Sequence, residues 1–186
     1  MAYNDIFIES LTEDDGKILI YIARNSIMGR KTGMEKIPEK FYTKAGAFVT
    51  INENKSLRGC IGYLRPVMPL KSAVEKAAWN AAFRDPRFEP VGSEELNRLT
   101  IEVTVIGELK DVKYEDIRRE KSGKYGLYME NGIYSGTLLP QVALDNNMDM
   151  EEFIGETCMK AGMGRDCYKY SKIYAYEAKI FTEKWD

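Results

Sequence analysis

The stretches GAFVTIN (residues 46–52) and LRGCIGYL (residues 57–64) decide the fold. In the first stretch, Ala47, Val49 and Ile51 are two residues apart, the spacing that places side chains on one face of a β-strand. The residues between the two stretches turn the chain, and the second stretch returns it. The pair therefore predicts an antiparallel hairpin, and we expect its second strand at the core of the sheet.

Helical patterns lie before and after this hairpin. Thr12, with Asp15 three residues later, forms a capping box, and Gly29 ends the helix that follows. Residues 70–83 predict a second helix, whose small apolar stripe suits close packing against a sheet. A third helix begins at Asp149. The stripes of the second and third helices are Leu70, Ala73, Val74, Ala77, Ala78 and Ala81, and Met150, Phe153, Ile154, Thr157, Cys158 and Ala161.

Further strands follow from alternating apolar residues. Residues 100–109 alternate cleanly, and residues 173–183 predict one final strand. Asn131-Gly132 separates two short strand patterns, which predicts a hairpin closed by a type I′ turn. Residues 93–95 predict a short capped helix. Helices and strands are interspersed without regular alternation, so the expected fold class is α+β, with a largely antiparallel sheet flanked by helices.

Length and composition predict one domain over residues 1–186. Either of two polar segments, residues 29–44 or 110–124, could mark a smaller lobe, and the second is expected to be solvated. The formal net charge of −2 gives no electrostatic footprint for nucleic acid, and no apolar run is long enough to span a bilayer. The acidic residues within positions 1–9 do not fit a signal peptide.

The residue types restrict the chemistry. The absence of histidine excludes the usual serine–histidine and cysteine–histidine catalytic groups and histidine-ligated metal sites. Cys60, Cys158 and Cys167 form no close pair in the sequence and match no zinc spacing, so no metal site is predicted. A reducing cytosol is the simplest setting for an odd number of thiols. We expect Cys158 to be a buried thiol, and Cys167, in a basic glycine-flanked loop, to be an exposed and reactive one.

The segment LRGCIG (residues 57–62) carries the most informative chemical signal. On a strand, Arg58 and Cys60 lie on the same face about 7 Å apart, and a guanidinium favours the thiolate form of a nearby cysteine. The two interior glycines indicate close approach of a ligand or of another backbone. Cys60 is therefore either a reactive thiol or a buried structural one. Arg58 is either an anion-binding cation or the partner of a carboxylate such as Glu102.

Two further places could contribute to a site. In DPRF (residues 85–88), proline holds Asp85 and Arg87 stiffly. The two side chains either line a cleft, as a base and a ligand-binding cation, or cap the preceding helix and pair with each other. Gln141, after the second predicted hairpin, could bind a ligand or the backbone, and both alternatives stay open. No glycine-rich phosphate loop is present, and the sequence leaves any cofactor unknown.

Four motifs in this order resemble those of the AMMECR domain family: LRGCIG (57–62), DPRF (85–88), LLPQVA (138–143) and KAG (160–162). The resemblance covers residues 46–168. It implies a two-lobed α+β fold and a cytoplasmic protein of a prokaryote, similar to protein A of the AmmeMemoRadiSam system. It also implies a Memo-like protein and a radical S-adenosylmethionine protein as partners, and it supplies no reaction.

Two classes of function remain open. An enzyme would present Cys60 as a nucleophile, Asp85 as a base, and Arg58 and Arg87 as anion-binding groups in one concave cleft. A non-catalytic module would use the same surface to bind a partner protein or nucleic acid, with Cys60 buried beneath it. We expect a role in a multi-protein system, and the sequence does not decide whether the chain is an enzyme.

Overall fold

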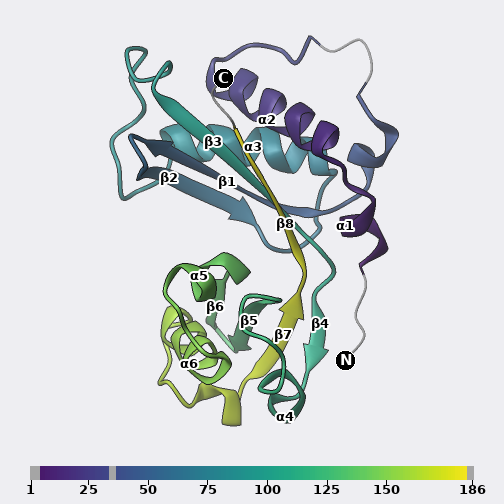
Figure 1. Cartoon of the computed structure of the whole chain (residues 1–186). Helices are drawn as coiled ribbons and strands as arrows, with labels where there is room; N and C mark the ends of the chain where they lie inside the picture. The colour runs from purple at the N-terminus through teal and green to yellow at the C-terminus, as the bar shows by residue number, and fades with distance from the viewer. Residues whose placement is uncertain (1–4, 34–36, 184–186) are drawn as a thin grey trace. The chain divides into compact units, whose positions relative to one another are not determined.

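The hairpin predicted over residues 46–64 is present in the computed structural model (Figure 1). Strand β1 (Gly46–Glu53) pairs antiparallel with strand β2 (Ser56–Tyr63). The turn between them places Asn54 and Lys55 at φ values of 50° and 66°. Two successive positive φ values are characteristic of a type I′ turn, whose twist matches that of the flanking strands.

The structure describes residues 5–33 and 37–183, which fall into two units. The amino-terminal unit comprises residues 6–106 and the segment from residue 179 onward, and the middle unit comprises residues 107–178 with Asp5. Each unit has its own four-stranded antiparallel sheet and its own hydrophobic core. Within the described part of the chain, no helix is both long enough and apolar enough to cross a membrane.

The sheet of the amino-terminal unit has the strand order β2-β1-β3-β8. Strand β3 (Leu99–Ile106) pairs along the whole of β1, on the side opposite to β2. Strand β2 therefore lies at the edge of the sheet, and the expectation that it lies at the core was wrong. Apolar alternation reports which faces of a strand are buried, but not which neighbours pair with it.

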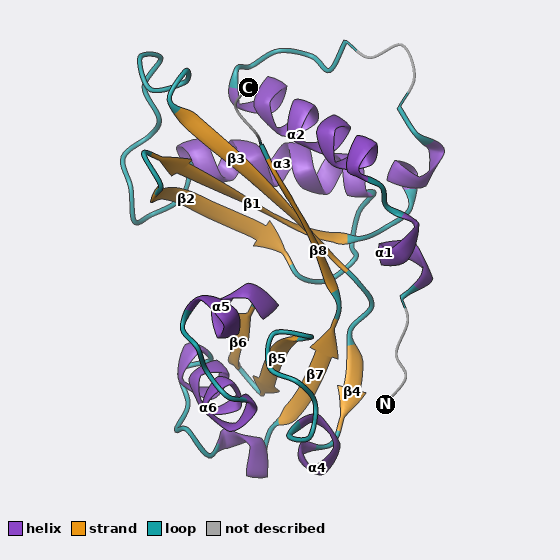
Figure 2. Cartoon of the chain, viewed as in Figure 1, coloured by secondary structure: helices purple, strands orange, loops and turns teal. Residues whose placement is uncertain are grey.

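Helices α2 (Glu13–Ile27) and α3 (Leu70–Phe83) cover one face of this sheet (Figure 2). The predicted capping box begins α2, because Thr12 and Asp15 each accept a hydrogen bond from the backbone N–H of the other. The predicted small-residue stripe of α3 is buried along its whole length. A short helix and a 3-10 turn complete the unit: α1 (Ile6–Ser10) and η1 (Glu39–Tyr42).

The predicted final strand over residues 173–183 is in fact two strands. Strand β7 (Lys172–Tyr176) belongs to the sheet of the middle unit, whereas β8 (Ala178–Thr182) belongs to that of the amino-terminal unit. Glu177 alone separates them. The β-pattern continues on both sides of this residue, without the glycine or proline that usually marks a strand end.

The middle unit has the strand order β4-β7-β5-β6, with helix α6 (Met150–Lys160) as predicted from its capping box at Asp149. The segment 110–124, expected to be solvated, instead contains a strand and a helical turn, and Ile117 is fully buried. The other elements are β4 (Lys110–Val112), α4 (Tyr114–Ile117), β5 (Gly126–Asn131), β6 (Tyr134–Leu138), α5 (Pro140–Asp145) and η2 (Cys167–Lys169).

Two local predictions need correction. The hairpin at Asn131-Gly132 forms, but Asn131 pairs with Tyr134, so Gly132 and Ile133 are the central turn residues. Of these two, only Gly132 has a positive φ, +60°, which excludes type I′ and fits a glycine at the first position of a type II′ turn. Residues 93–98 form successive turns rather than a helix.

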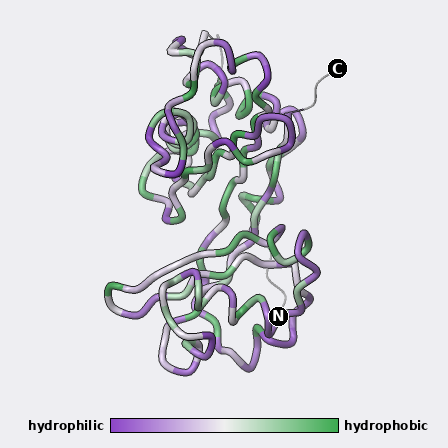
Figure 3. Tube along the Cα trace, turned by 90° about the vertical axis from the view of Figure 1, so that its left-hand side faces the viewer, coloured by the Kyte–Doolittle hydropathy of each residue, from purple (hydrophilic) through white to green (hydrophobic). Residues whose placement is uncertain are grey.

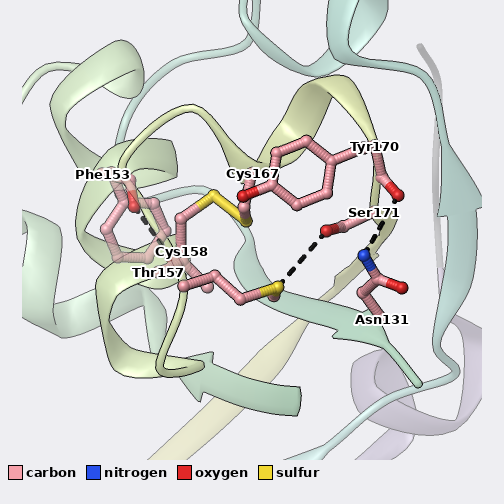
Figure 4. The surroundings of a disulfide bond; sticks show 8 residues. Asn131, Phe153, Thr157, Cys158, Cys167, Tyr170 and Ser171 are labelled. Carbon is pink, nitrogen blue, oxygen red and sulfur yellow. Dashed lines mark hydrogen bonds between the residues drawn. A yellow bond between two sulfur atoms is a disulfide. The ribbon is translucent and has the colours of Figure 1, made fainter. Parts of the chain in front are cut away.

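Cys158 is buried as expected, but the expectations that it is a free thiol and that Cys167 is an exposed one were wrong. Cys158 and Cys167 form a disulfide with their Cα atoms 5.6 Å apart, and both residues are fully buried (Figure 4). Gly162, at a φ of +77°, follows the end of α6 and allows the chain to reverse. This reversal brings together two cysteines that are nine positions apart in the sequence. Cys60 is the free thiol.

Both cores follow from the apolar patterning of the chain, and the alternation of hydrophobic and hydrophilic residues is visible along the trace in Figure 3. The core of the amino-terminal unit joins α2 and α3 to the inner face of the sheet, and the core of the middle unit is built around α6 and β5. Since each core buries apolar surface by itself, each unit has its own source of hydrophobic stabilisation.

Candidate functional site

Strand β2 packs closely on both of its faces. On the α3 side, a Cβ atom at Gly59 would come within 2.1 Å of the backbone oxygen of Ala81. On the other side, a Cβ atom at Gly62 would come within 2.3 Å of the Phe48 ring. Of the two explanations for the interior glycines, the approach of another backbone accounts for Gly59. The space beside Gly62 is filled by an aromatic ring of the protein itself.

The DPRF loop, which follows α3, binds the free edge of β2. The backbone N–H of Cys60 donates to Asp85 Oδ2 at 2.9 Å, and Arg87 Nη2 donates to the Cys60 carbonyl oxygen at 3.2 Å. The N–H and C=O of a residue in an antiparallel strand point to the same side, so these bonds occupy the position that another strand would take. The loop thereby covers part of a sheet edge that would otherwise expose unpaired backbone groups.

Asp85 and Arg87 form a two-point ion pair, which agrees with the alternative that the two side chains pair with each other. Arg87 Nε and Nη2 donate to the carboxylate at 2.9 and 2.6 Å. The side chain of Asp85 is 1% exposed, whereas that of Arg87 is 51% exposed. The hydrogen bonds from Arg87 hold the pKa of Asp85 well below its usual range, in spite of burial. A carboxylate held ionised in this way is a poor general base near neutral pH.

The Cys60 thiol is half-buried and lies 3.2 Å from Thr50 Oγ1. Burial raises the pKa of this thiol, and it outweighs the hydrogen bond with Thr50 and the Coulomb attraction of Arg87. The thiolate is the nucleophilic form of cysteine, so Cys60 is not activated. The predicted activation by Arg58 is absent because that guanidinium is turned toward a carboxylate.

Arg58 is bound by Glu95, and not by Glu102. Its Nε and Nη2 donate to the Glu95 carboxylate at 2.7 and 3.1 Å, and its Nη1 donates to the carbonyl oxygen of Glu89 at 2.9 Å. The hydrogen bond from Arg58 lowers the pKa of Glu95, which also accepts the Gly92 backbone N–H at 2.6 Å. Arg58 thus ties the turn after the DPRF loop to β2, and the geometry favours the carboxylate-partner alternative.

Phe88 lies near both guanidinium groups. The Cζ atoms of Arg58 and Arg87 are 6.0 and 5.4 Å from the centre of its ring, which are cation–π distances. The aromatic ring therefore joins the two ion pairs into one assembly. We call this assembly the β2-edge cluster, and it consists of Arg58, Cys60, Asp85, Arg87, Phe88 and Glu95.

Gln141 does not belong to this cluster. It lies in α5 of the middle unit, and its Oε1 atom is buried without a hydrogen bond from any described residue. The predicted site residues therefore separate into four that the structure gathers on β2 and one that it places elsewhere. No group of three or more cysteine, aspartate or glutamate side chains within residues 5–33 and 37–183 is arranged to hold a metal ion.

Sequence reasoning did not identify Glu95 and Thr50 as members of the site. Thr50 has a partial signal, because it lies on the strand predicted to pair with that of Cys60. Counting back from the turn would place Val49 opposite Cys60, and a register shift between Ile51 and Asn52 puts Thr50 there instead. Glu95 has no such signal, since it is 37 positions from Arg58 and lies in an irregular turn. Only the folding of the turn onto β2 brings the two charges together.

Comparison with known proteins places the chain in a family. The family model described as AMMECR1 matches residues 20–181. A protein of Methanosarcina acetivorans is 41% identical over 187 residues and covers 94% of each chain, and one of Pyrococcus furiosus is 40% identical over 191 residues, with 94% of this chain and 91% of its own covered. The crystal structure of an uncharacterized protein from Pyrococcus horikoshii matches with a TM-score of 0.88 and 38% identity over 94% of both chains. Since these matches extend across both sheets, the chain belongs to the AMMECR1 family.

Proposed function

We propose that this chain is a non-catalytic binding module of a cytoplasmic multi-protein system, and that it binds a Memo-like protein and a radical S-adenosylmethionine protein. One observation carries the proposal. The β2-edge cluster pairs its ionised groups with one another and leaves a single oriented cation, Arg87, half-exposed at the surface. The choice of partners rests on the motifs that resemble the AMMECR domain family.

The same observation argues against catalysis at this place. A nucleophilic Cys60 would need a lowered pKa, and a general base at Asp85 would need one near neutrality. The surroundings instead raise the pKa of Cys60 and lower the pKa of Asp85. Both groups also serve a structural purpose, because Asp85 binds the backbone of Cys60 at the sheet edge.

Arg87 has the properties of an anchor residue in a protein interface. Asp85 orients its guanidinium through Nε and Nη2, so little side-chain entropy remains to be lost when a partner binds. Arginine and aromatic residues are enriched among the residues that dominate binding energy, and Phe88 lies beside Arg87. A carboxylate or a backbone carbonyl of the partner is the complementary group.

The test measures the affinity of the purified chain for each partner protein by calorimetry, with Arg87→Lys as the variant. Lysine keeps the charge but loses the planar fork, so we expect affinity to fall by about tenfold or more. Arg84→Lys is the matched control, because Arg84 is an exposed arginine at the end of α3. Urea unfolding of both variants shows whether the fold is retained.

Two results would contradict the proposal. One is that neither partner protein binds the wild-type chain. The other is that Arg87→Lys binds the partners as tightly as Arg84→Lys does. The enzyme alternative has a separate readout in the reconstituted three-protein mixture. If Cys60→Ala abolishes a chemical conversion there while association is unchanged, the chain is a catalyst.

A further inference from the structure

Two adjoining hollows surround Trp79 on the side of α3 that faces away from the sheet. Their volumes are about 410 and 350 Å³, and both are lined by Ser26, Glu75 and Trp79. Ser26 Oγ donates to the Glu75 carbonyl oxygen at 2.7 Å and so fixes the end of α2 against α3. None of these residues belongs to the β2-edge cluster, so the hollows are a separate feature of the amino-terminal unit.

Trp79 provides a fixed aromatic surface. Its side chain is 43% exposed, and its ring lies against that of Phe83 with a centroid distance of 4.4 Å. Such contact with Phe83 limits the rotation of the indole, while the exposed part stays open to the hollows. An exposed and immobilised indole is suited to stacking against a flat ring. A nucleic-acid base is such a ring, and any of the bases can stack in this way.

The first hollow is positively charged. Arg30, Lys31 and Lys71 line it, with Glu75 as its acidic residue. Lys71 Nζ lies 2.5 Å from Glu75 Oε1, so this pair offsets itself. Arg30 and Lys31 are exposed, and among the residues that the structure describes no acidic side chain pairs with them. Thr32 Oγ1 also donates to Glu75 Oε1 at 3.3 Å, which holds the chain after α2 beside α3. Two neighbouring cations at one end of an aromatic surface suit a phosphate group.

The second hollow is polar, and its two charged residues, Glu75 and Lys76, have opposite signs. Asn80 and Tyr63 line it, and Asn80 Nδ2 donates to Tyr63 Oη at 3.2 Å. A carboxamide carries both donors and acceptors, and a phenol carries one of each. Together they can bind the polar edge of a heterocyclic base. The lining around Trp79 thus changes from an excess of cations in the first hollow to a polar surface of balanced charge in the second.

We propose that these hollows, named here the Trp79 site, bind a free mononucleotide. The base stacks on Trp79 and meets Asn80 and Tyr63, and the phosphate binds Arg30 and Lys31. A free nucleotide is favoured over a nucleic-acid strand because the chain has a formal net charge of −2, without the excess of basic residues typical of strand binding.

Equilibrium dialysis of the purified chain against adenosine, guanosine, cytidine and uridine 5′-monophosphates tests the site. We expect saturable binding that weakens as salt is raised, because the phosphate contact is electrostatic. Adenosine and ribose 5-phosphate each carry half of the proposed contacts, so each should bind at least tenfold more weakly than adenosine monophosphate. No saturable binding of any monophosphate at millimolar concentration overturns the proposal.

Variants locate the site. Trp79→Leu should weaken binding by about tenfold or more, and Trp79→Phe should retain most of it, because phenylalanine keeps a ring for stacking. Lys31→Ala should weaken binding by about fivefold. The matched control is Lys17→Ala, which removes an exposed lysine of α2 that lies outside the hollows. Urea unfolding of each variant confirms that the fold is retained.

Two further results of the dialysis experiment would overturn the proposal. One is equal loss of binding in Lys17→Ala and Lys31→Ala, which would show non-specific attraction. The other is much tighter binding of a single-stranded oligonucleotide than of the monophosphate, which would make a strand the ligand. Neither bears on partner binding by the β2-edge cluster, because Arg87 is not part of the Trp79 site.

Discussion

Asp85 receives hydrogen bonds from the backbone N–H of Cys60 and from the backbone and side chain of Arg87. Because these bonds favour the carboxylate form, the pKa of Asp85 is lower in the folded chain than its usual value of 3.8. The ionised Asp85 therefore contributes to stability above the unfolded-state pKa, and the contribution is lost as the pH falls through the folded-state pKa.

The first prediction follows from this linkage. Asp85→Asn should lower the free energy of unfolding by about 2 to 4 kcal/mol at pH 7, because an amide at this buried position turns an NH₂ group toward N–H donors that now bind a carboxylate oxygen. The difference between variant and wild type should shrink as the pH falls below about 4, where the wild-type carboxylate of the unfolded chain is protonated. Urea unfolding at a series of pH values measures it, and a difference that stays constant from pH 7 to pH 3 would refute the argument.

Arg58 gives a second prediction. Arg58→Ala should cost about 2 kcal/mol of stability, because it leaves the largely buried Glu95 without its two-point partner. The matched control is Arg98→Ala, in which a half-exposed arginine loses its contact with Glu53. An exposed pair of this kind contributes at most about 1 kcal/mol. Equal losses for the two variants would show that the Arg58–Glu95 pair is no more than a surface contact.

The thiols give a third prediction. One cysteine should react with a thiol reagent in urea without reductant, and three after reduction, because Cys158 and Cys167 are paired. In the native chain, Cys60 should react slowly at pH 7 and faster as the pH rises, since burial raises its pKa. Mass mapping of the labelled peptides identifies the site. Labelling of Cys167 in the unreduced protein would contradict the disulfide.

Much of the β2-edge cluster was predictable from residue patterns. Strand periodicity placed Arg58 and Cys60 on one face, and the proline between Asp85 and Arg87 indicated a rigid pair. The protonation states were not predictable, because they depend on burial and on partners that are distant in sequence. Glu95 is such a distant partner. The Cys158–Cys167 disulfide was missed for a different reason, because it forms where an irregular segment folds back onto the end of α6.

At the scale of elements, the backbone contact between β2 and α3 gives a fourth prediction. Gly59→Ala should cost about 3 kcal/mol or more, because the added Cβ would meet the rigid backbone oxygen of Ala81. Gly33→Ala is the matched control, since a Cβ there meets no atom within 4 Å. Thermal unfolding compares the two variants. A stable Gly59→Ala protein would mean that α3 can move away from β2 at little cost.

Helices and hairpins were largely predictable because their signals are local. The capping boxes at Thr12 and Asp149 and the apolar stripe of α3 each lie within one element. Strand order and the division of residues 172–182 between two sheets were not predictable, since pairing partners are set by the whole chain. The short helix α5 also escaped prediction, because six residues are too few for a clear period.

At the scale of the whole molecule, the two separate cores give a fifth prediction. Reduction of the Cys158–Cys167 disulfide should cost about 2 to 3 kcal/mol in the middle unit, the amount expected for a closed loop of this length. Because the disulfide belongs to the core of that unit alone, amide exchange should accelerate within residues 107–178 and stay unchanged within residues 6–106. Cys60→Ser under oxidising conditions is the control. Uniform acceleration across both units would show that they unfold together.

The position of β8 determines the order in which the two units can be completed on the ribosome. Domains generally fold from the amino terminus as synthesis proceeds. Here the amino-terminal unit must wait for its last edge strand until the entire middle unit has been synthesised. This strand brings Phe181 against Gly16, and the residue after it, Glu183, pairs with Arg24. The unit that is translated first is therefore finished last, and until then the nascent chain carries an open side on β3 that a chaperone would have to shield from other growing chains.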